Sequence, residues 1–385
     1  MPGLLPNIDP DGLLEFSVVY TDRALNHMSR RFAGVMQDIL STLKQVYHAH
    51  SAALVPGSGT FGMEAVARQF VDQGANTGKV LIVRNGWFSY RWTQIFDMGK
   101  LGDGTVVCQA RRQGPNLDHN PQAPWAPCPA DEVAAKIRAE KPVMVFAPHV
   151  ETASGIILTD DYLRAVSAAA HEVGALFVLD CIASGAMWVD MQATGVDVLI
   201  SAPQKGWSGS PCCAMVMLSQ RARAAIDSTT SSSFACDLRK WLQIAEGYEQ
   251  GKHAYHATMP TDALQRLRDM MLETRALGFE QARARQVELG ARVRALLESR
   301  GFPSVAAPGW QSPGVVVSYT TDPGIQNGSK FVAVGLQAAS GVPLQCGEGA
   351  DFSTFRLGLF GLEKLRNVDR TVKHLTTALD KIAAQ

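Results

Sequence analysis

Short apolar runs rich in β-branched residues alternate with longer amphipathic stretches through the middle of the chain. The runs are Lys79–Arg84, Pro142–Phe146, Ala175–Asp180 and Asp197–Ser201. Runs of this length, bounded by helical patterns, are typical of buried strands in a mostly parallel sheet. The stretches Asp131–Glu140 and Asp161–Val173 are long enough to form crossover helices between such strands. The pattern predicts a doubly wound α/β domain.

The pattern changes after Met259. Thr261–Leu297 is a long helical pattern dense in Arg, Glu and Leu, and strand candidates follow at Gly314–Tyr319 and Thr354–Gly358. A last helix is expected at Val368–Ala384. We therefore expect a connecting helix that leads into a smaller α+β domain. The domain prediction is an N-terminal segment at 1–25 that contributes to the active site or a dimer interface, a large domain at 26–260, and the connecting helix with the small domain at 261–385.

Composition narrows the class of protein. Apolar residues make up 46% and charged residues 19% of the 385 positions, as in packed globular proteins. Lys plus Arg equals Asp plus Glu at 36 each, so no overall field favours nucleic acid or an anionic membrane. The chain opens without a basic segment followed by an apolar run, and no stretch is long and apolar enough to span a bilayer. We expect a cytoplasmic protein with neither nucleic acid nor membrane as partner.

The seven cysteines are odd in number and scattered, without CxxC pairs or histidines at metal-ligand spacing. We expect buried thiols and no metal site.

Lys205 and Asp180 both follow predicted strands. Lys205 lies in a Gly/Ser/Pro-rich turn after the strand at Asp197–Ser201, where open α/β sheets bind ligands. Its amine is suited to imine chemistry there, although a lone lysine after a strand is more often a solvated loop residue. Asp180 ends an apolar strand, where its carboxylate could bind a protonated ring nitrogen or cap a helix.

Three further segments bring polar or small residues to predicted strand ends. The turn with Ser58, Gly59 and Thr60 leads into a helical pattern at Met63–Phe70, so its backbone N–H groups are suited to an anion. Trp87 follows the strand at Lys79–Arg84 and could stack on a ring or fill the core. The segment His149-Val-Glu-Thr-Ala-Ser-Gly155 follows the strand at Pro142–Phe146. Four strand ends therefore carry polar or small residues at one edge of the predicted sheet, which predicts a single site there.

Together these residues resemble the class V aminotransferases of fold type I, in particular the alanine–glyoxylate and serine–pyruvate branch, from about Asn26 to Gly361. The resemblance implies pyridoxal 5′-phosphate (PLP) as cofactor, a large domain with a mostly parallel seven-stranded sheet, and a smaller C-terminal α+β domain. It implies an aminotransferase that moves an amino group from a small amino acid of the alanine or serine type to glyoxylate or pyruvate by a ping-pong mechanism.

The resemblance also implies roles for single residues. Lys205 would bind the cofactor aldehyde and move the catalytic proton, while Asp180 would hold the pyridine nitrogen. The implied cofactor contacts are Ser58, Gly59, Thr60 and Gln204 at the phosphate, Trp87 on the ring and Thr152 at the 3′-oxygen. Tyr255 and Thr258 would reach the phosphate of a neighbouring subunit, which implies a homodimer with shared active sites. Arg356 would grip the substrate carboxylate.

The chain departs from the family at its start. The usual Pro-Gly-Pro loop is replaced by Phe16–Arg23, so the substrate stays open, and an aminophosphonate or ureido substrate is compatible with the same cofactor residues. Tyr20 or Arg23 could touch the substrate or, as we favour, pack at the dimer interface.

Three other classes of function are disfavoured. A PLP-dependent lyase or desulfurase would place a histidine before the lysine, where this chain has Gln204, and would carry a reactive cysteine on a mobile loop, for which Cys346 is a poor candidate. A transcription regulator would need a DNA-binding domain. A nicotinamide-binding protein would need a glycine fingerprint after its first strand.

Overall fold

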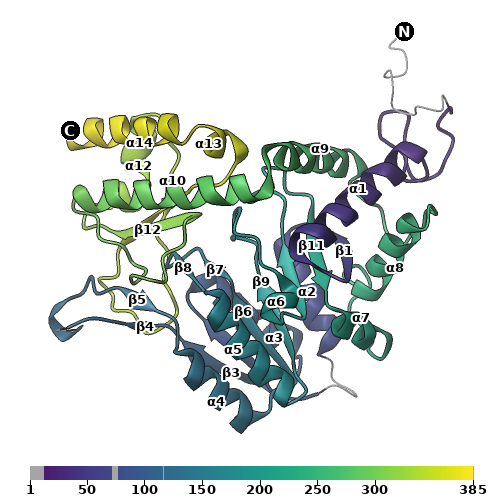
Figure 1. Cartoon of the computed structure of the whole chain (residues 1–385), viewed down its shortest axis with the longest axis horizontal. Helices are drawn as coiled ribbons and strands as arrows, with labels where there is room; N and C mark the ends of the chain where they lie inside the picture. Colours follow the sequence, from purple (N-terminus) through teal and green to yellow (C-terminus); the bar gives the residue numbers. More distant parts are fainter. Residues whose placement is uncertain (1–12, 72–76, 116, 385) are drawn as a thin grey trace.

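The computed structural model describes residues 13–71, 77–115 and 117–384. Its centre is a seven-stranded sheet in the order β1-β11-β10-β9-β6-β2-β3 (Figure 1). The strands are β1 (Ser51–Pro56), β11 (Cys213–Leu218), β10 (Val198–Ser201), β9 (Leu176–Asp180), β6 (Met144–Pro148), β2 (Val80–Arg84) and β3 (Thr105–Gln109). β11 runs antiparallel to both neighbours, and the other pairs are parallel. The predicted α/β class is confirmed.

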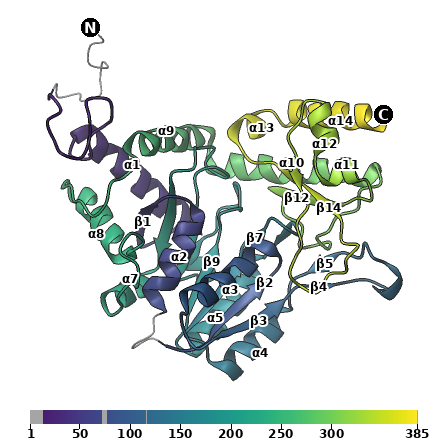
Figure 2. The same cartoon turned by 180° about the vertical axis from the view of Figure 1, so that it is seen from behind.

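Helices cover both faces of this sheet, which explains why the central strands are apolar along their whole length. α4 (Ala130–Glu140) and α5 (Asp160–Glu172) lie on the face seen in Figure 1. α2 (Gly59–Phe70) and α3 (Trp87–Gly99) lie on the face seen in Figure 2. The remaining helices around the sheet are α1 (Arg30–Tyr47), α6 (Met191–Thr194), α7 (Gln220–Asp227) and α8 (Leu238–Glu249).

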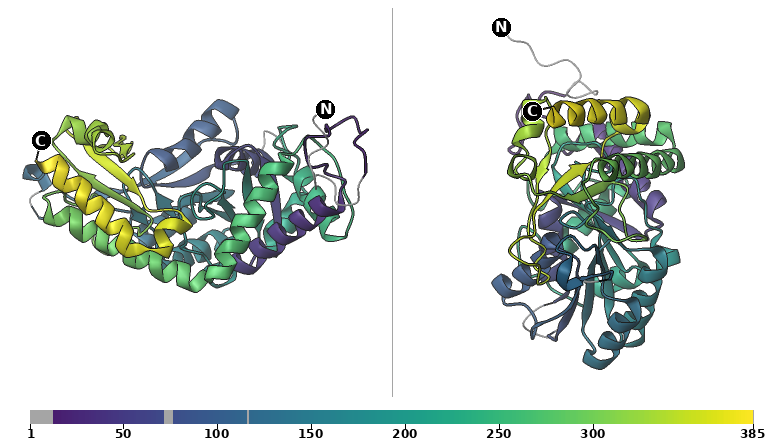
Figure 3. Two further views of the ribbon diagram at one scale, coloured as in Figure 1. Left: turned by 90° about the horizontal axis from the view of Figure 1, so that it is seen from above. Right: turned by 90° about the vertical axis from the view of Figure 1, so that its left-hand side faces the viewer.

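A second, three-stranded antiparallel sheet lies toward the C-terminus. Its order is β12 (Val315–Tyr319), β14 (Thr354–Gly358) and β13 (Ala339–Ser340). α10 (Phe279–Ser299) and α14 (Val368–Ala383) run side by side along it (Figure 3). The shorter elements here and at the junction with the large sheet are α11 (Pro323–Gln326), α12 (Ser329–Ala333), α13 (Leu362–Arg366), β4 (Arg111–Arg112), β5 (Trp125–Ala126), β7 (Val150–Glu151), β8 (Ile156–Ile157) and a 3₁₀ turn at Leu117–His119.

The predicted single helix at Thr261–Leu297 is wrong. The segment forms two helices, α9 (Thr261–Leu277) and α10, which meet at Gly278. Gly278 has φ +93°, a conformation that a helix cannot contain and that glycine adopts without a Cβ penalty. Its N–H closes α9 on the carbonyls of Thr274 and Arg275, and its carbonyl accepts the first bond of α10 from Ala282. The helical pattern of apolar and polar residues continues across this break, so it does not indicate the conformation of the glycine.

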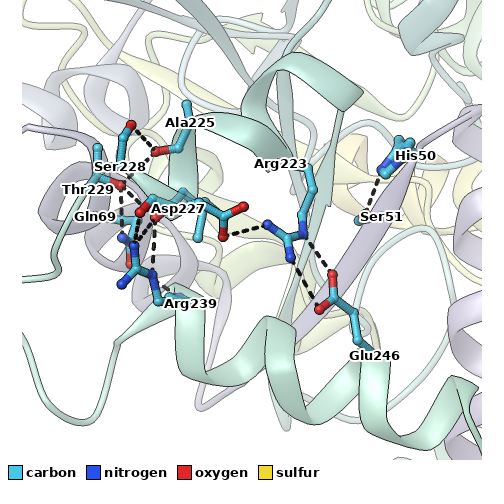
Figure 4. A network of polar contacts seen from close by, with 11 residues as sticks. His50, Ser51, Gln69, Arg223, Ala225, Asp227, Ser228, Thr229, Arg239 and Glu246 are labelled. Atoms are coloured by element: carbon cyan, nitrogen blue, oxygen red, sulfur yellow. Dashed lines mark hydrogen bonds and ion pairs between the residues drawn. The ribbon is translucent and has the colours of Figure 1, made fainter.

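Polar contacts tie α7 and α8 to α2 on the outer side of the sheet (Figure 4). Arg223 of α7 bonds Glu246 of α8 at 2.7 Å and Asp227 at 2.9 Å. Gln69 of α2 donates to Thr229 at 3.1 Å and accepts from the backbone of Arg239 at 3.2 Å. This side of the molecule is a structural support and lies apart from the strand ends that carry the predicted chemistry.

The seven cysteines are free and buried, as the sequence predicted. Within the described part of the chain, the helices are all too short or too polar to cross a membrane.

Candidate functional site

The carboxyl ends of the parallel strands meet at one edge of the large sheet. Asp180 at the end of β9 stands level with Ile200 of β10 and with Pro148 of β6. The backbone N–H of His149 donates to the carbonyl of Asp180 at 2.8 Å, which locks these two strand ends together. Lys205 follows β10 at the same edge, so the predicted lysine and aspartate lie in one site.

Asp180 is a buried carboxylate. Its Oδ1 accepts a hydrogen bond from the backbone N–H of Ile182 at 2.9 Å. Burial raises the pKa of Asp180 to about 6, and the Ile182 N–H and the charge of Lys205 oppose this rise. The carboxylate is therefore held where a cationic partner would stabilise its charged form.

Four charged groups act on the pKa of the Lys205 amine. Burial lowers the pKa of Lys205, the negative charges of Asp180 and Glu151 raise it, and the guanidinium groups of Arg356 and Arg91 lower it. The Nζ atom lies 5.8 Å from the centre of the Phe360 ring. An amine whose pKa is lowered is neutral more often at pH 7, and a neutral amine is what attacks an aldehyde or accepts a proton.

The turn between β1 and α2 forms a cradle beside Asp180. Gly57 has φ +122°, and Ser58 precedes α2 without capping it through its side chain. A Cβ on Gly59 would lie 2.5 Å from Ile182 Cδ1, so only glycine allows the helix start to approach the end of β9 this closely. The first N–H groups of α2 have no side-chain cap, which suits them to bind an anion such as phosphate.

Among the described residues, two buried polar side chains near the strand ends have no hydrogen-bond partner. They are Thr152, through Oγ1, and Asn85, through both amide atoms. Unpaired buried polar atoms are uncommon in folded proteins, because each costs desolvation energy without a compensating bond. The Thr152 hydroxyl is thus a group to which a bound molecule would supply the missing partner.

Glu151 is the main site residue that sequence analysis missed. Its carboxylate is buried and accepts hydrogen bonds from the backbone of Phe88 at 3.2 Å and of Ser89 at 2.8 Å. It thereby binds the N-terminus of α3, the turn that begins with Trp87. Sequence analysis also missed Arg91 of α3, which donates to Thr60 Oγ1 at 3.0 Å. Arg91 follows Trp87 by one helical turn, and this spacing could have indicated that it lies near the predicted site.

Arg356 reaches this site from β14 of the small sheet. Its guanidinium carbon lies 5.5 Å from the centre of the Phe88 ring, and its Nε donates to the carbonyl of Ser340 at 2.8 Å. Burial lowers its pKa, and the charge of Glu151 raises it. Neither terminal nitrogen has a hydrogen bond to any residue in the described ranges. These two nitrogens are free to bind a carboxylate as a fork.

The structure does not place every predicted residue at this edge. The Gln204 side chain is exposed. Tyr255 is 55% exposed, its hydroxyl lies 3.2 Å from Thr258 Oγ1, and its ring packs against His27 near the N-terminal segment. Within that segment the Tyr20 hydroxyl donates to the carbonyl of Met259, and Arg23 is exposed. Gln204 directly precedes Lys205 in the chain. In the part of the chain that the structure describes, the other predicted residues named here make no hydrogen bond or ring contact with Lys205.

Cys346 is not a mobile nucleophile. Its thiol is buried and donates to the carbonyl of Arg84 at 3.5 Å. Burial raises its pKa to about 12, so the reactive thiolate is scarce at neutral pH.

The lysine, the nearby carboxylate, the uncapped helix start and the orphaned hydroxyl fit a phosphorylated aromatic aldehyde such as PLP. The lysine suits the aldehyde, Asp180 the ring nitrogen, the helix start the phosphate, and Thr152 a ring oxygen.

Comparison with known proteins agrees with this fit. The aminotransferase class-V family matches residues 14–323. An L-aspartate–glyoxylate aminotransferase of Paracoccus denitrificans is 29% identical over 284 residues, 72% of this chain and 66% of that protein, just under two thirds of its length. A 2-aminoethylphosphonate–pyruvate transaminase of Paraburkholderia phymatum is 28% identical over 93% of each chain.

The fold agrees as well. The structure of an alanine–glyoxylate aminotransferase from Nostoc sp. superposes with a TM-score of 0.74 at 20% identity, covering 92% of this chain and 88% of the other. Because the family match spans most of the sequence, the chain belongs to the class V aminotransferases, a family of PLP-dependent transaminases.

Proposed function

We propose that this protein is a ping-pong aminotransferase that moves the amino group of a small amino acid, of the alanine or serine type, to a small 2-oxo acid such as glyoxylate or pyruvate. The observation that carries the proposal is that Asp180 and Lys205 follow adjacent parallel strands at one edge of the sheet, and that the charges of Asp180 and Arg356 both act on the pKa of the Lys205 amine. An amine, a ring anchor and a carboxylate clamp are the three groups that this reaction requires of the protein.

The cofactor supplies an electron sink for the carbanion formed at the substrate Cα. Asp180 would hold the ring nitrogen, and the backbone at Ser58, Gly59 and Thr60 would bind the phosphate together with Gln204. Thr152 would donate to the ring oxygen, and Trp87 would stack on the ring. The roles follow from the family resemblance and are consistent with the free hydroxyl of Thr152 and the uncapped start of α2.

The chain's own residues would perform the proton transfer. The Arg356 fork binds the substrate carboxylate and fixes the orientation of Cα relative to Lys205. The lowered pKa of Lys205 favours its neutral amine, which could take the proton from the substrate Cα and return it two atoms further along, to the carbon on the other side of the substrate nitrogen. The aromatic rings of Phe88 and Phe360 line this space and limit the access of water.

We extend the proposal to a homodimer in which Tyr255 and Thr258 complete the phosphate site of the partner subunit. Both residues lie on an exposed turn, which leaves them available to a second copy. The neighbouring N-terminal segment exposes Leu13, Leu14, Phe16 and Val18, and apolar side chains of this kind are commonly covered in an oligomer.

A 2-aminoethylphosphonate donor is the second candidate. The relative of that name matches 93% of this chain, and Arg91 adds a cation close to Lys205 and Asp180 that could bind a phosphonate.

The first experiment records the absorption spectrum of purified protein with PLP, then after addition of L-alanine, L-serine, L-aspartate or 2-aminoethylphosphonate. We expect a band of lysine-bound cofactor that one donor converts to that of the aminated cofactor. Lys205→Ala should lack the first band, whereas Lys79→Ala, a surface lysine paired with Glu140, should keep it. Failure of the wild-type protein to bind PLP would refute the proposal, and consumption of a donor without the aminated cofactor would favour a lyase.

The dimer is tested by mixing two inactive variants. Lys205→Ala and a Tyr255→Ala/Thr258→Ala double variant are unfolded together and refolded. Mixed dimers would contain one site with both wild-type components, so we expect activity to return to about a quarter of the wild-type value for random pairing. No recovery, with a monomeric mass by light scattering, would refute the shared site.

A further inference from the structure

A cavity lies between the large domain and the long helix α10. Its volume is about 550 Å³, and it extends from the start of α5 to the middle of α10. The residues that line it do not include Lys205, Asp180 or Arg356. The cavity is therefore separate from the site described above.

Two arginines of α10 bring positive charge to this cavity without a carboxylate partner. Arg283 makes no hydrogen bond or ion pair with any residue in the described ranges. Arg294 donates from Nη2 to the carbonyl of Ser312 at 2.6 Å, while its buried Nε has no partner in the part of the chain that the structure describes. Burial lowers the pKa of Arg294, and Glu298 opposes this. A partly buried arginine that has no carboxylate partner among the described residues is suited to an anionic ligand.

The acidic groups of the cavity neutralise little of this charge. Asp161 is already paired with Arg164 at 2.6 Å. Asp160 at the start of α5 is exposed and is the remaining carboxylate among the lining residues. The cavity thus keeps an excess of positive charge on the side formed by α10.

The other walls are apolar or neutral. Trp188 and Val287 provide apolar surface, and His149 lies deeper, 4% exposed. The Nδ1 atom of His149 is 2.7 Å from Ser184 Oγ. Burial and the charge of Arg283 lower the pKa of His149 to about 3, so the ring is neutral at pH 7 and offers Nε2 as a hydrogen-bonding atom.

We propose that this cavity binds a small organic carboxylate with an apolar body, whose carboxylate pairs with Arg283 and whose body lies against Trp188 and Val287, while Arg294 adds positive charge farther along α10. Guanidinium groups bind carboxylates through paired, charge-assisted bonds, and an apolar wall favours a ligand that removes that surface from water. A ligand here would contact His149, which begins the segment that carries Glu151 and Thr152 at the active site. The inference does not depend on the reaction proposed above.

The test titrates benzoate into PLP-loaded protein by calorimetry. Benzoate can also occupy the active site through Arg356, so the titration is made in the Arg356→Ala background. We expect one site, weakened about tenfold or more by Arg283→Ala because a charge-assisted bond is lost, and less by Arg283→Lys. Arg292→Ala removes a surface arginine of the same helix that pairs with Glu288 and Asp369, and should leave binding unchanged.

A second variant keeps Arg283 but supplies it with a carboxylate partner from its own helix. Val287→Glu places a carboxylate one helical turn after Arg283, at a position that is 46% exposed and so tolerates the change. It should abolish benzoate binding without lowering the melting temperature. No binding in the Arg356→Ala background, or binding that Arg283→Ala leaves intact, would overturn the proposal. Inorganic phosphate that binds as tightly as benzoate would overturn the requirement for an apolar body.

Discussion

The carboxylate of Glu151 holds the first turn of α3 through Ser89, whose backbone N–H and hydroxyl both donate to Oε2, at 2.8 and 2.7 Å. Oε1 accepts two further bonds from the backbone N–H groups of Phe88 and Ala153. A buried charge is tolerable when several donors satisfy it, and here the donors belong to the helix whose first residue is Trp87.

Glu151→Gln should therefore destabilise the protein although it changes one atom. The new NH₂ group would face N–H donors in place of an acceptor, so we expect the free energy of unfolding to fall by about 1–3 kcal/mol. Urea titration of the cofactor-free protein measures this. The matched control is Glu132→Gln, which breaks an exposed ion pair with Arg111 and should cause no measurable change. Equal stability of both variants would show that the Glu151 charge does not hold α3.

Thr152→Val tests whether the orphaned hydroxyl serves the cofactor. The hydroxyl is buried without a partner, so the isosteric change should leave the cofactor-free protein as stable or make it slightly more stable. PLP affinity should fall about five- to tenfold, because the bond to the ring oxygen is lost.

Thr194→Val is the opposite case. Its buried hydroxyl donates to the carbonyl of Asp190 at 2.6 Å, so the variant should lose about 1 kcal/mol of stability and keep its PLP affinity. Titration of PLP followed by fluorescence, together with urea unfolding, separates the two. A Thr152→Val protein that is destabilised and binds PLP normally would assign Thr152 a structural role only.

Sequence analysis located the strand ends because each predicted strand carries its own local pattern. Asp180 and Lys205 follow apolar runs that can be recognised without knowledge of the rest of the fold. The strands β9 and β10 each begin one residue later than predicted. The function of Glu151 could not be predicted in this way, since its bonds are made to a helix more than sixty residues earlier in the chain. The contact of Arg91 with Thr60 depends in the same way on packing between α3 and α2.

The break at Gly278 could not be predicted from the local pattern either, because it depends on the backbone conformation of one residue. Glycine inside a helical pattern lowers helix stability without stopping the helix, and φ +93° is set by how α9 and α10 pack on different parts of the fold. Gly278→Ala should cost about 1 kcal/mol or more, from backbone strain alone, because the new Cβ meets no atom closer than 3.8 Å.

Gly34→Ala gives the control for that change. Gly34 lies inside α1 with nothing within 4 Å of the added Cβ, so the substitution should raise the free energy of unfolding by about 0.5–1 kcal/mol. Urea unfolding of the two variants should therefore shift in opposite directions. A shift to higher stability in both would mean that α9 and α10 can join into one helix.

Asp180→Asn should make the stability of the cofactor-free protein less dependent on pH. Burial raises the pKa of Asp180 to about 6, above its value near 4 in an unfolded chain. The folded protein therefore keeps a proton that the unfolded chain has released, and this group's contribution to stability is lost as the pH rises from about 4 to 6. Above pH 6 the charged carboxylate costs about 3 kcal/mol, a penalty that asparagine avoids while still accepting the bond from Ile182.

The difference in unfolding free energy between Asp180→Asn and wild type should accordingly grow in favour of the variant between pH 4 and pH 6 and then level off. Urea titrations at pH 4, 5, 6 and 7 measure it. Addition of PLP at pH 7 should stabilise the wild type more than the variant, because a ring nitrogen that carries a proton supplies the cation that the buried carboxylate lacks. A constant difference in unfolding free energy across this pH range would mean that burial does not raise the pKa of Asp180. Equal stabilisation of both proteins by PLP would mean that Asp180 does not bind the cofactor ring.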